Sequence, residues 1–252
     1  MSDNILLYEE LSLNAYPAPQ TQIYDGWVLR FANGGYAATG GRVNSINLIY
    51  PSTIDLREKI AECERRYFAR GFPAVFKITE AADLSVDELL EQENYEIDKS
   101  NITFVMEMDL KDKEFEPADC VITDCAGDKW LNSYFSLSQC SDIKRTTTAQ
   151  IFRNVRNTMI CGRIVRGGAS VACGVSVIER GYTALLNLVV DESRRGKGYG
   201  AEICSALLSA AKDRGAHTAY LQVVRDNHAA INLYTKLGYK TIYSYWYRVR
   251  RA

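Results

Sequence analysis

The sequence has few histidines and no cysteine pair at the spacing of a metal or redox site. Its 252 residues include seven cysteines and two histidines, His217 and His228. The cysteine count is odd and no Cys-x-x-Cys occurs, which fits reduced thiols in a cytosol better than a disulfide framework. We therefore expect no metal site and no covalent cysteine mechanism, and we expect both histidines to be structural or surface residues.

Long apolar runs and an excess of one charge are also absent. No run approaches the ~18 apolar residues of a membrane span. Residues 1–4 lack a basic region and a long apolar stretch, so we expect no secretion signal. A net charge of −1 and a pI of about 6.2 leave no basic footprint for nucleic acid. These absences predict a cytoplasmic protein, and we interpret Arg248, Arg250 and Arg251 as a solvated strand end.

The sequence does contain a glycine-rich turn between an apolar strand and an amphipathic stretch. Such a turn leaves backbone N–H groups unpaired at a helix N-terminus, where they can hold a phosphate. Glycine leaves room for the anion and adopts positive φ at little cost. An unliganded surface turn is the alternative. The apolar run 185–190 ends at Asp191, and the turn follows as Arg195, Gly196, Lys197, Gly198, Tyr199 and Gly200.

The spacing of the glycines distinguishes three phosphate motifs. A Walker loop requires Ser or Thr after the lysine, but Gly198 follows Lys197. The dinucleotide motif requires G-x-G-x-x-G, whereas Gly196, Gly198 and Gly200 are spaced G-x-G-x-G. The pattern that remains is R-x-x-G-x-G, which begins at Arg195.

A second motif follows about one helix and one strand later. Residues 227–239 read N-x-x-A-x-x-x-Y-x-K-x-G-Y, with Asn227 at the start and Tyr234 near the middle. Together and in this order, the two motifs resemble the signatures of the GNAT N-acetyltransferase superfamily. Residues 185–239 resemble it closely. The rest of the chain loosely resembles bacterial tandem GNAT proteins of uncharacterised specificity, including residues 24–36, which we interpret as strand, glycine turn and strand.

The resemblance implies direct transfer of an acetyl group from the cosubstrate acetyl-CoA to a primary amine of a small molecule or peptide, by a monomer or homodimer. A bulge would splay the strand that binds the donor. Tyr234 would protonate the leaving thiolate, since a phenol with a pKa of about 10 is protonated at neutral pH; a core aromatic is the alternative. The donor contacts would be the strand backbone at Leu188, Val189 and Val190, the loop 195–200 for the pyrophosphate, and Asn227 for the pantetheine or adjacent backbone.

The general base is left unassigned. A lysine-like amine has a pKa of about 10.4, so only roughly one molecule in 10³ is neutral at pH 7. Many relatives carry a glutamate on the strand before the asparagine, but this chain has Gln222. Glu179 is a weak candidate, and a solvated carboxylate beside a hairpin turn is the alternative. Gln222 keeps open a second hypothesis, a non-catalytic module that binds or senses acyl-CoA.

The first half of the chain repeats the element order of the second. Gly71 corresponds to Gly215 and Tyr95 to Tyr239, each pair 144 residues apart. We therefore predict an α/β (α+β) protein with two tandem GNAT-like domains, each a mixed, mostly antiparallel sheet flanked by helices. The predicted boundaries are residues 1–110 for a degenerate domain, 111–117 for a linker and 118–252 for the catalytic domain.

The chemistry of the second half is not repeated in the first. Opposite the glycine loop lies the segment 51–56, which has no glycine, and opposite Tyr234 lies Leu90. Asp83, opposite Asn227, would repel phosphate. We predict one acyl-CoA site, with the first half as a scaffold or as a wall of the acceptor pocket. Three alternating tyrosines are candidates for core or pocket lining, and two tryptophans are predicted core: Tyr243, Tyr245, Tyr247, Trp27 and Trp130.

Overall fold

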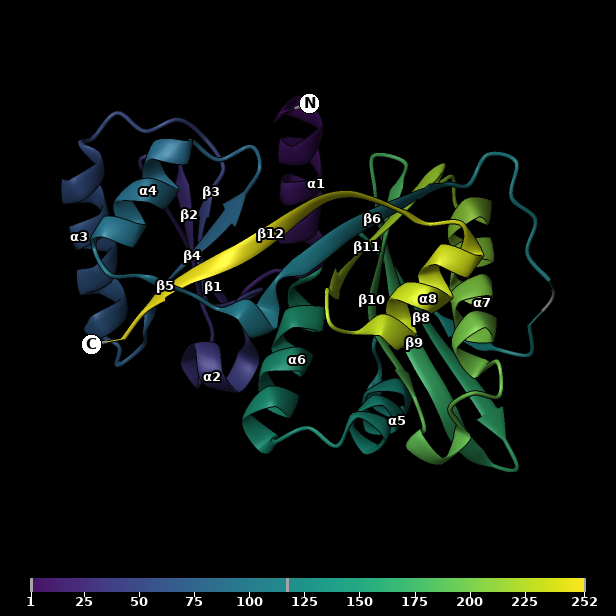
Figure 1. Ribbon diagram of the computed structural model, residues 1–252. Helices are drawn as coiled ribbons and strands as arrows, with labels where there is room; N and C mark the ends of the chain where they lie inside the picture. Colours follow the sequence, from purple (N-terminus) through teal and green to yellow (C-terminus); the bar gives the residue numbers. More distant parts are fainter. Residues whose placement is uncertain (1, 117, 252) are drawn as a thin grey trace.

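In the computed structural model, which describes residues 2–116 and 118–251, the strands form one continuous mixed sheet that is mostly antiparallel (Figure 1). The order across it is β1-β2-β3-β4-β12-β6-β11-β10-β9-β8-β7, and the short β5 pairs with β12. The predicted mixed sheet with flanking helices is therefore present, as one sheet that runs through both halves of the chain.

The first half supplies the elements at one end of this sheet and one of its central strands. They are α1 (Ser2–Ala15), β1 (Gln20–Tyr24), β2 (Trp27–Phe31), α2 (Gly35–Thr39), β3 (Ile46–Leu48), α3 (Leu56–Phe68), β4 (Ala74–Thr79), α4 (Leu84–Gln92), β5 (Glu96–Ile97), the 3₁₀ turn η1 (Lys99–Asn101) and β6 (Thr103–Asp109).

The second half begins with a short edge strand and two helices before the long central strands. Its elements are β7 (Val121–Thr123), α5 (Asp128–Ser138), α6 (Asp142–Asn154), β8 (Thr158–Arg166), β9 (Ala169–Glu179), β10 (Tyr182–Val190), the 3₁₀ turn η2 (Glu192–Arg194), α7 (Tyr199–Asp213), β11 (Thr218–Val224), α8 (His228–Leu237) and β12 (Lys240–Arg250).

Local sequence signals explain where the repeated helices begin. Asp55 caps α3 by accepting from the N–H groups of Arg57 and Glu58, the geometry that aspartate favours at an N-cap. Asp83 caps α4 and Asn227 caps α8 in the same way. These two caps are 144 residues apart, so the repeat seen in the sequence corresponds to a repeat of structure.

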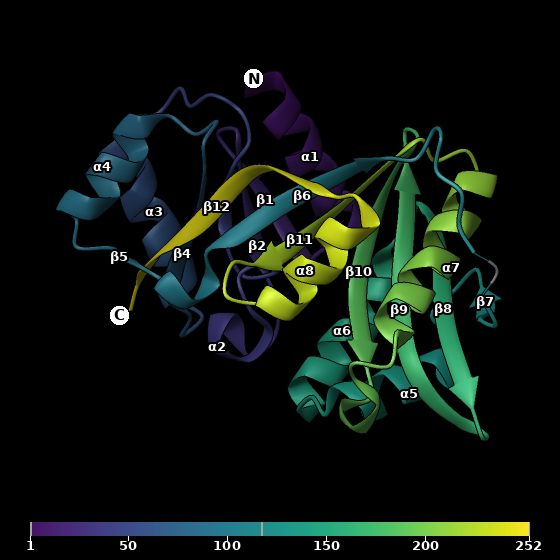
Figure 2. The same cartoon turned by 45° about the vertical axis from the view of Figure 1, so that its right-hand side comes forward.

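The two halves exchange their last strands. β6, from the first half, pairs antiparallel with β11, while β12, from the second half, pairs antiparallel with β4. β6 and β12 also pair with each other at the centre of the sheet. Figure 1 shows the consequence: the yellow strand β12 crosses the molecule, so the C-terminus lies beside α3 in the first half. Figure 2 shows the same two strands side by side from another direction.

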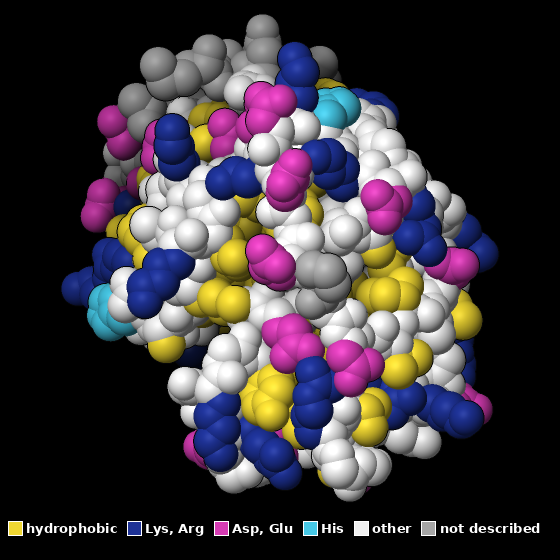
Figure 3. All heavy atoms as spheres, turned by 90° about the vertical axis from the view of Figure 1, so that its right-hand side faces the viewer, with side chains coloured by type: hydrophobic (Ala, Val, Ile, Leu, Met, Phe, Trp, Pro, Cys, Tyr) yellow, Lys and Arg dark blue, Asp and Glu magenta, His cyan; other side chains and the backbone are white. Residues whose placement is uncertain are grey.

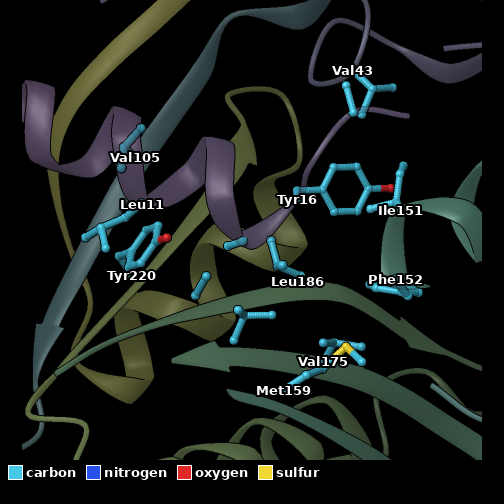
Figure 4. Close-up of a cluster of buried hydrophobic side chains, with 14 of the residues drawn as sticks. Leu11, Tyr16, Val43, Val105, Ile151, Phe152, Met159, Val175, Leu186 and Tyr220 are labelled. Carbon is cyan, nitrogen blue, oxygen red and sulfur yellow. The ribbon is translucent and has the colours of Figure 1, made fainter. Parts of the chain in front are cut away.

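Helix α1 packs where the halves meet. Leu11 and Tyr8 are buried in one apolar cluster with Val105 and Tyr220. Figure 4 shows Leu11 on α1 directed toward Tyr220. Burial of several large side chains at about 1.5–3 kcal/mol each makes this contact a major source of stability.

The tryptophans and most of the predicted elements lie where the sequence places them, but one segment differs. Trp27 and Trp130 are 2% and 4% exposed and are core residues, as predicted. The segment 24–36 is not strand, glycine turn and strand. The turn lies earlier, at Asp25 and Gly26 between β1 and β2, and the later glycines begin helix α2. Asp25 and Gly26 both have positive φ, which a tight two-residue hairpin requires. Of the predicted linker, residue 117 lies outside the described residues.

Candidate active site

Two parallel strands separate near the middle of the second half. β10 and β11 pair only as far as Leu185 and Leu221. Beyond that point β10 remains paired with β9, with a register shift between Leu186 and Val189. Asn187, within the shift, has φ +50°, a left-handed conformation that marks a bulge. The splay that the sequence implied is therefore present.

The splay opens a cleft of about 690 Å³. One side consists of Leu185–Leu188 of β10 and Gln222–Val224 of β11, and Tyr234 of α8 closes one end. The first half supplies the opposite wall, through residues 36–42 around α2 and through Tyr16. A cleft with walls from distant segments is the usual form of a small-molecule site.

The glycine-rich loop lies at the start of α7 and has the geometry of an anion cradle. Gly196 and Gly198 have φ +74° and +86°, and Gly198 is the N-cap without a side-chain capping bond. The first N–H groups of α7 are thus left available, and the helix dipole favours an anion there. Gly200 serves packing instead, because a Cβ atom there would lie 3.1 Å from Cδ2 of Leu233. The loop residues Arg195 and Lys197 are exposed to solvent.

The predicted pantetheine strand has one free edge. Val189 and Val190 pair with Cys173 and Ala172 of β9, and the recorded pairs of β10 with β11 end before them. Leu188 lines the cleft. An unpaired strand edge presents N–H and C=O groups that an extended amide-containing chain can pair with.

Asn187 presents a second unsatisfied group at this position. Its Nδ2 donates to the Tyr134 hydroxyl at 2.9 Å, while its Oδ1 is buried without a partner among the described residues. A buried acceptor without a donor is costly in an unliganded protein. Its place in the cleft suits a ligand that carries N–H groups, as the pantetheine arm and an amine both do.

Tyr234 lies in the cleft, and its hydroxyl forms no hydrogen bond with another of the described residues. It is 9% exposed and packs edge-on against Tyr239 at a ring separation of 5.9 Å. Burial raises the pKa of Tyr234 well above its ordinary value, so the phenol stays protonated at neutral pH. The structure thus brings a buried, protonated phenol to the cleft, together with Asn227, whose Oδ1 accepts from the N–H of Ala230 at 3.2 Å.

The position of the missing glutamate is held firmly by hydrogen bonds. Gln222 Oε1 accepts from the Tyr245 hydroxyl at 3.2 Å, and its Nε2 donates to Ser12 Oγ at 3.0 Å. Glu179 lies elsewhere, where its carboxylate accepts from Asn14 and Asn157, and it does not line the cleft. A base in direct contact with the acceptor is therefore absent at both positions that the sequence suggested.

In the first half, an internal carboxylate occupies the corresponding loop. Asp25 accepts from the N–H groups of Thr53 and Ile54 at 2.9 and 3.0 Å, and it pairs with the buried Lys59 at 3.1 Å. The hydrogen bond from Thr53 is the largest of several effects that hold the pKa of Asp25 far below its ordinary value. In the second half, the corresponding N–H groups belong to the glycine loop before α7. In the first half, the N–H groups before α3 are bound by a carboxylate of the protein itself.

Several cleft residues could not be inferred from motifs. Arg42, Tyr16 and Tyr36 come from loops and short helices of the first half, and no spacing signal connects them with residues 185–239. The alternating tyrosines gave a partial signal. Tyr243, Tyr245 and Tyr247 are all buried, and the last two line the cleft.

The described residues contain no group of His, Cys, Asp and Glu that could hold a metal ion. Both histidines are exposed, as the sequence predicted. Within the same part of the chain, no helix has the length and apolar character needed to cross a membrane. Figure 3, which views the second half from the side, shows Lys and Arg mixed with Asp and Glu and no broad basic face.

Comparisons with known proteins agree on one family. Residues 3–248 match the family described as "Probable histone acetyltransferase Rv0428c C-terminal". The protein named "Uncharacterized N-acetyltransferase YobR" of Bacillus subtilis (strain 168) is 28% identical over 271 residues, covering 99% of this chain and 100% of YobR.

Solved structures show the same fold at low sequence identity. A GCN5-related N-acetyltransferase from Kribbella flavida has a TM-score of 0.72 at 16% identity, covering 100% of this chain and 96% of its own. A tandem GNAT protein from the clavulanic acid biosynthesis pathway has a TM-score of 0.68 at 13% identity, covering 96% and 87%. Both likenesses extend over the two halves of the chain.

Proposed function

Because this chain belongs to the family of the Rv0428c C-terminal acetyltransferase, and is thus an acyl-CoA-dependent N-acyltransferase of the GNAT type, we propose its donor, acceptor and mechanism. It transfers an acetyl group directly from acetyl-CoA to a primary amine of a small molecule or peptide. The observation that carries this proposal is the uncommitted Tyr234 hydroxyl in the cleft where β10 and β11 separate.

The geometry of the second half supports the proposed binding roles. The N–H groups of residues 195–200 hold the pyrophosphate at the start of α7, and Arg195 and Lys197 add charge from the solvent side. Leu188, Val189 and Val190 pair with the pantetheine amides along the free edge of β10. Asn227 keeps α8 capped, which fixes Tyr234 on the first two turns of that helix.

The chemical step requires a proton to be added to the leaving sulfur and a proton to be removed from the amine nitrogen. Tyr234 donates its proton as the carbon–sulfur bond breaks, so that sulfur leaves as a thiol rather than as a thiolate, and the proton that the attacking nitrogen then loses restores the phenol, directly or through water. The amine must enter without its proton, and Gln222 cannot remove it. We propose that the proton leaves to solvent before attack, so that kcat/KM rises about tenfold per pH unit below the pKa of the amine.

Tyr234→Phe tests the proton donor. We expect kcat to fall by about 10²-fold or more while acetyl-CoA still binds, because general acid catalysis commonly contributes this much. Steady-state CoA release from a responsive amine and calorimetric titration with acetyl-CoA measure the two effects.

Tyr239→Phe is the matched control. Tyr239 is also buried, contacts Tyr234, and has a hydroxyl without a partner among the described residues. Its variant should keep full activity. Equal activity of wild type and Tyr234→Phe would remove the assigned role of Tyr234.

The alternative function is a non-catalytic acyl-CoA-binding or sensing module, favoured by Gln222 at the position where a base is expected. It predicts binding of acetyl-CoA without CoA release for any amine, up to a pH near the pKa of the amine. Single-turnover mixing at pH 9 distinguishes the two, because there the lack of a base matters least.

A further inference from the structure

The acceptor side of the cleft carries an excess of positive charge. A narrow inner chamber continues the cleft toward β4, and the two share Tyr16, Arg42 and Gln222. Their charged lining residues are four cations and one carboxylate: Arg30, Arg42, Lys77, Lys144 and Glu9. The whole chain has a net charge of −1, so this excess is local.

The single carboxylate is already neutralised. Lys77 and Glu9 form an ion pair at 2.5 Å, and both are nearly inaccessible, at 6% and 3% exposure. The Tyr243 hydroxyl also donates to Glu9 at 2.8 Å. Because Glu9 is already paired with Lys77, it does not compensate the charges of Arg30 and Arg42.

Neither arginine forms an ion pair with any described residue. Arg30 is 4% exposed, and its guanidinium donates to the backbone carbonyl of Tyr16. Burial lowers the pKa of Arg30 to about 10. Arg42 stacks on the ring of Tyr16, with its guanidinium carbon 4.5 Å from the ring centre. By contrast Arg248, which is about as buried as Arg30, forms an ion pair with Asp87.

A buried cation without a carboxylate, as at Arg30, is expensive inside a protein, and the partly exposed Arg42 adds a like charge near it. A cleft lined by charges of one sign attracts a ligand of the opposite sign. A guanidinium offers paired N–H donors that match a carboxylate in two parallel hydrogen bonds.

We propose that the acceptor is an amino-carboxylate, whose carboxylate binds Arg42 while its amine lies at the split between β10 and β11. This inference rests on the proposed function, because it assigns the group at the far end of the acceptor. Arg30, which lines the inner chamber together with Arg42, adds to the positive potential.

The size of the inner chamber limits how the acceptor is placed. Its volume of about 20 Å³ accommodates a single water-sized group. The carboxylate therefore stops at Arg42, and the body of the acceptor occupies the wider cleft lined by Tyr16, Tyr245 and Tyr247. These aromatic walls suit an acceptor with an aliphatic or aromatic body.

The phosphates of the donor do not account for these charges. The loop 195–200 does not line the chamber or the cleft, and it has its own cations in Arg195 and Lys197. Arg42 instead comes from the wall built by the first half, with Tyr16 and Tyr247 as neighbours.

The first experiment compares matched acceptors on the wild-type full chain. The probes are glycine, β-alanine, 4-aminobutanoate, L-leucine and L-phenylalanine, each tested beside its carboxamide. We expect the best carboxylate to exceed its amide at least 10-fold in kcat/KM for CoA release, when each value is expressed per neutral amine, because the amine of the amide has the lower pKa. Equal rates for every acid and amide pair would overturn the proposal while leaving the acetyltransferase function intact.

The second experiment assigns the discrimination to Arg42. In Arg42→Gln, kcat/KM for the carboxylate should fall about 10- to 100-fold, mostly through KM, while the rate with its amide changes less than threefold. Arg42→Lys should recover part of the loss, because it retains the charge without the paired donors. Arg145→Gln, an exposed arginine outside the cleft, is the control and should match wild type.

Calorimetry with acetyl-CoA distinguishes the remaining outcomes. Wild type and Arg42→Gln should bind acetyl-CoA with the same affinity. A loss confined to acetyl-CoA binding in Arg42→Gln would place Arg42 in the donor site and overturn the proposal. No binding of acetyl-CoA by folded wild type would instead overturn the proposed function itself.

Discussion

At the scale of single residues, Gly198 is the residue of the donor loop whose backbone conformation can be tested most cleanly. It has φ +86°, and the space that a Cβ atom would occupy is open. We predict that Gly198→Ala destabilises the protein by about 1 kcal/mol, because an L-residue pays that much in the left-handed region, and that it weakens acetyl-CoA binding at least 10-fold. Thermal unfolding and calorimetric titration measure the two effects.

Gly215 provides the control for this substitution. It ends α7 with φ +89°, and its Cβ position is equally open. Gly215→Ala should show the same loss of stability with unchanged acetyl-CoA affinity. If both variants weaken binding alike, the effect comes from general destabilisation and the loop loses its assigned role.

The lowered pKa of Asp25 predicts how the stability of the folded protein depends on pH. Its pKa in the folded protein is depressed, with the hydrogen bond from Thr53 as the largest cause, relative to about 3.9 in an unfolded chain. The stabilisation is therefore complete above about pH 4 and is lost as the pH falls toward the folded pKa. Asp25→Asn should be less stable than wild type at pH 7, and the difference should shrink below pH 4.

Urea unfolding of both proteins between pH 3 and pH 7 measures this difference. The exposed Asp112→Asn is the control and should follow wild type at every pH. A constant difference between Asp25→Asn and wild type across the range would show that the Asp25 charge is not what holds the segment 51–55.

At the scale of elements, the exchange of β6 and β12 ties the two halves together. β4 has β12 as its antiparallel neighbour, and β11 has β6. A fragment of residues 1–110 would lack β12, and a fragment of residues 118–252 would lack β6, so each would expose a long edge of central sheet. We predict that neither fragment folds alone and that the full chain unfolds in one transition.

Circular dichroism and two-dimensional NMR of the two fragments, alone and mixed, test this prediction. Dispersed amide signals from residues 118–252 alone would contradict it, and would show instead that the second half is an independent domain at the boundary predicted from the sequence.

The sequence predicted those elements whose signals are local. The glycine loop and the segment 227–239 each contain their own spacing. The helix caps at Asp83 and Asn227 are also local signals of residue type, although neither residue was predicted as a cap. The exchange could not be predicted in this way. A repeat of 144 residues makes β6 and β12 equivalent, so the sequence does not say which copy of the central sheet each strand joins.

The residues of the candidate site also divide into those that local motifs predicted and those that they could not predict. Tyr234 and the loop 195–200 were accessible from motifs, since the residues that act together lie within one repeat. Arg42, Tyr16 and the hydrogen bonds of Asp25 to the segment before α3 could not be inferred from motifs. They depend on contacts between segments that are distant in the chain, such as α1, the loop after α2 and the cleft. The hairpin at Asp25 and Gly26 was also missed, although the dipeptide Asp-Gly is a hairpin signal.

At the scale of the whole molecule, the proposed function gives donor binding to the second half and a wall of the acceptor pocket to the first. The second half has the glycine loop, the free edge of β10 and Tyr234. The first half has lost the equivalents, since Leu90 is fully buried and Asp25 occupies the N–H groups before α3. Its remaining contribution to the cleft is the wall that carries Arg42 and Tyr36.

The most direct test of this account is calorimetric titration of the full chain with acetyl-CoA, beside the double variant Arg195→Glu/Gly198→Glu. We predict a stoichiometry near one acetyl-CoA per chain for wild type and no binding for the folded double variant. A stoichiometry near two, or binding that survives in the double variant, would contradict a single donor site in the second half.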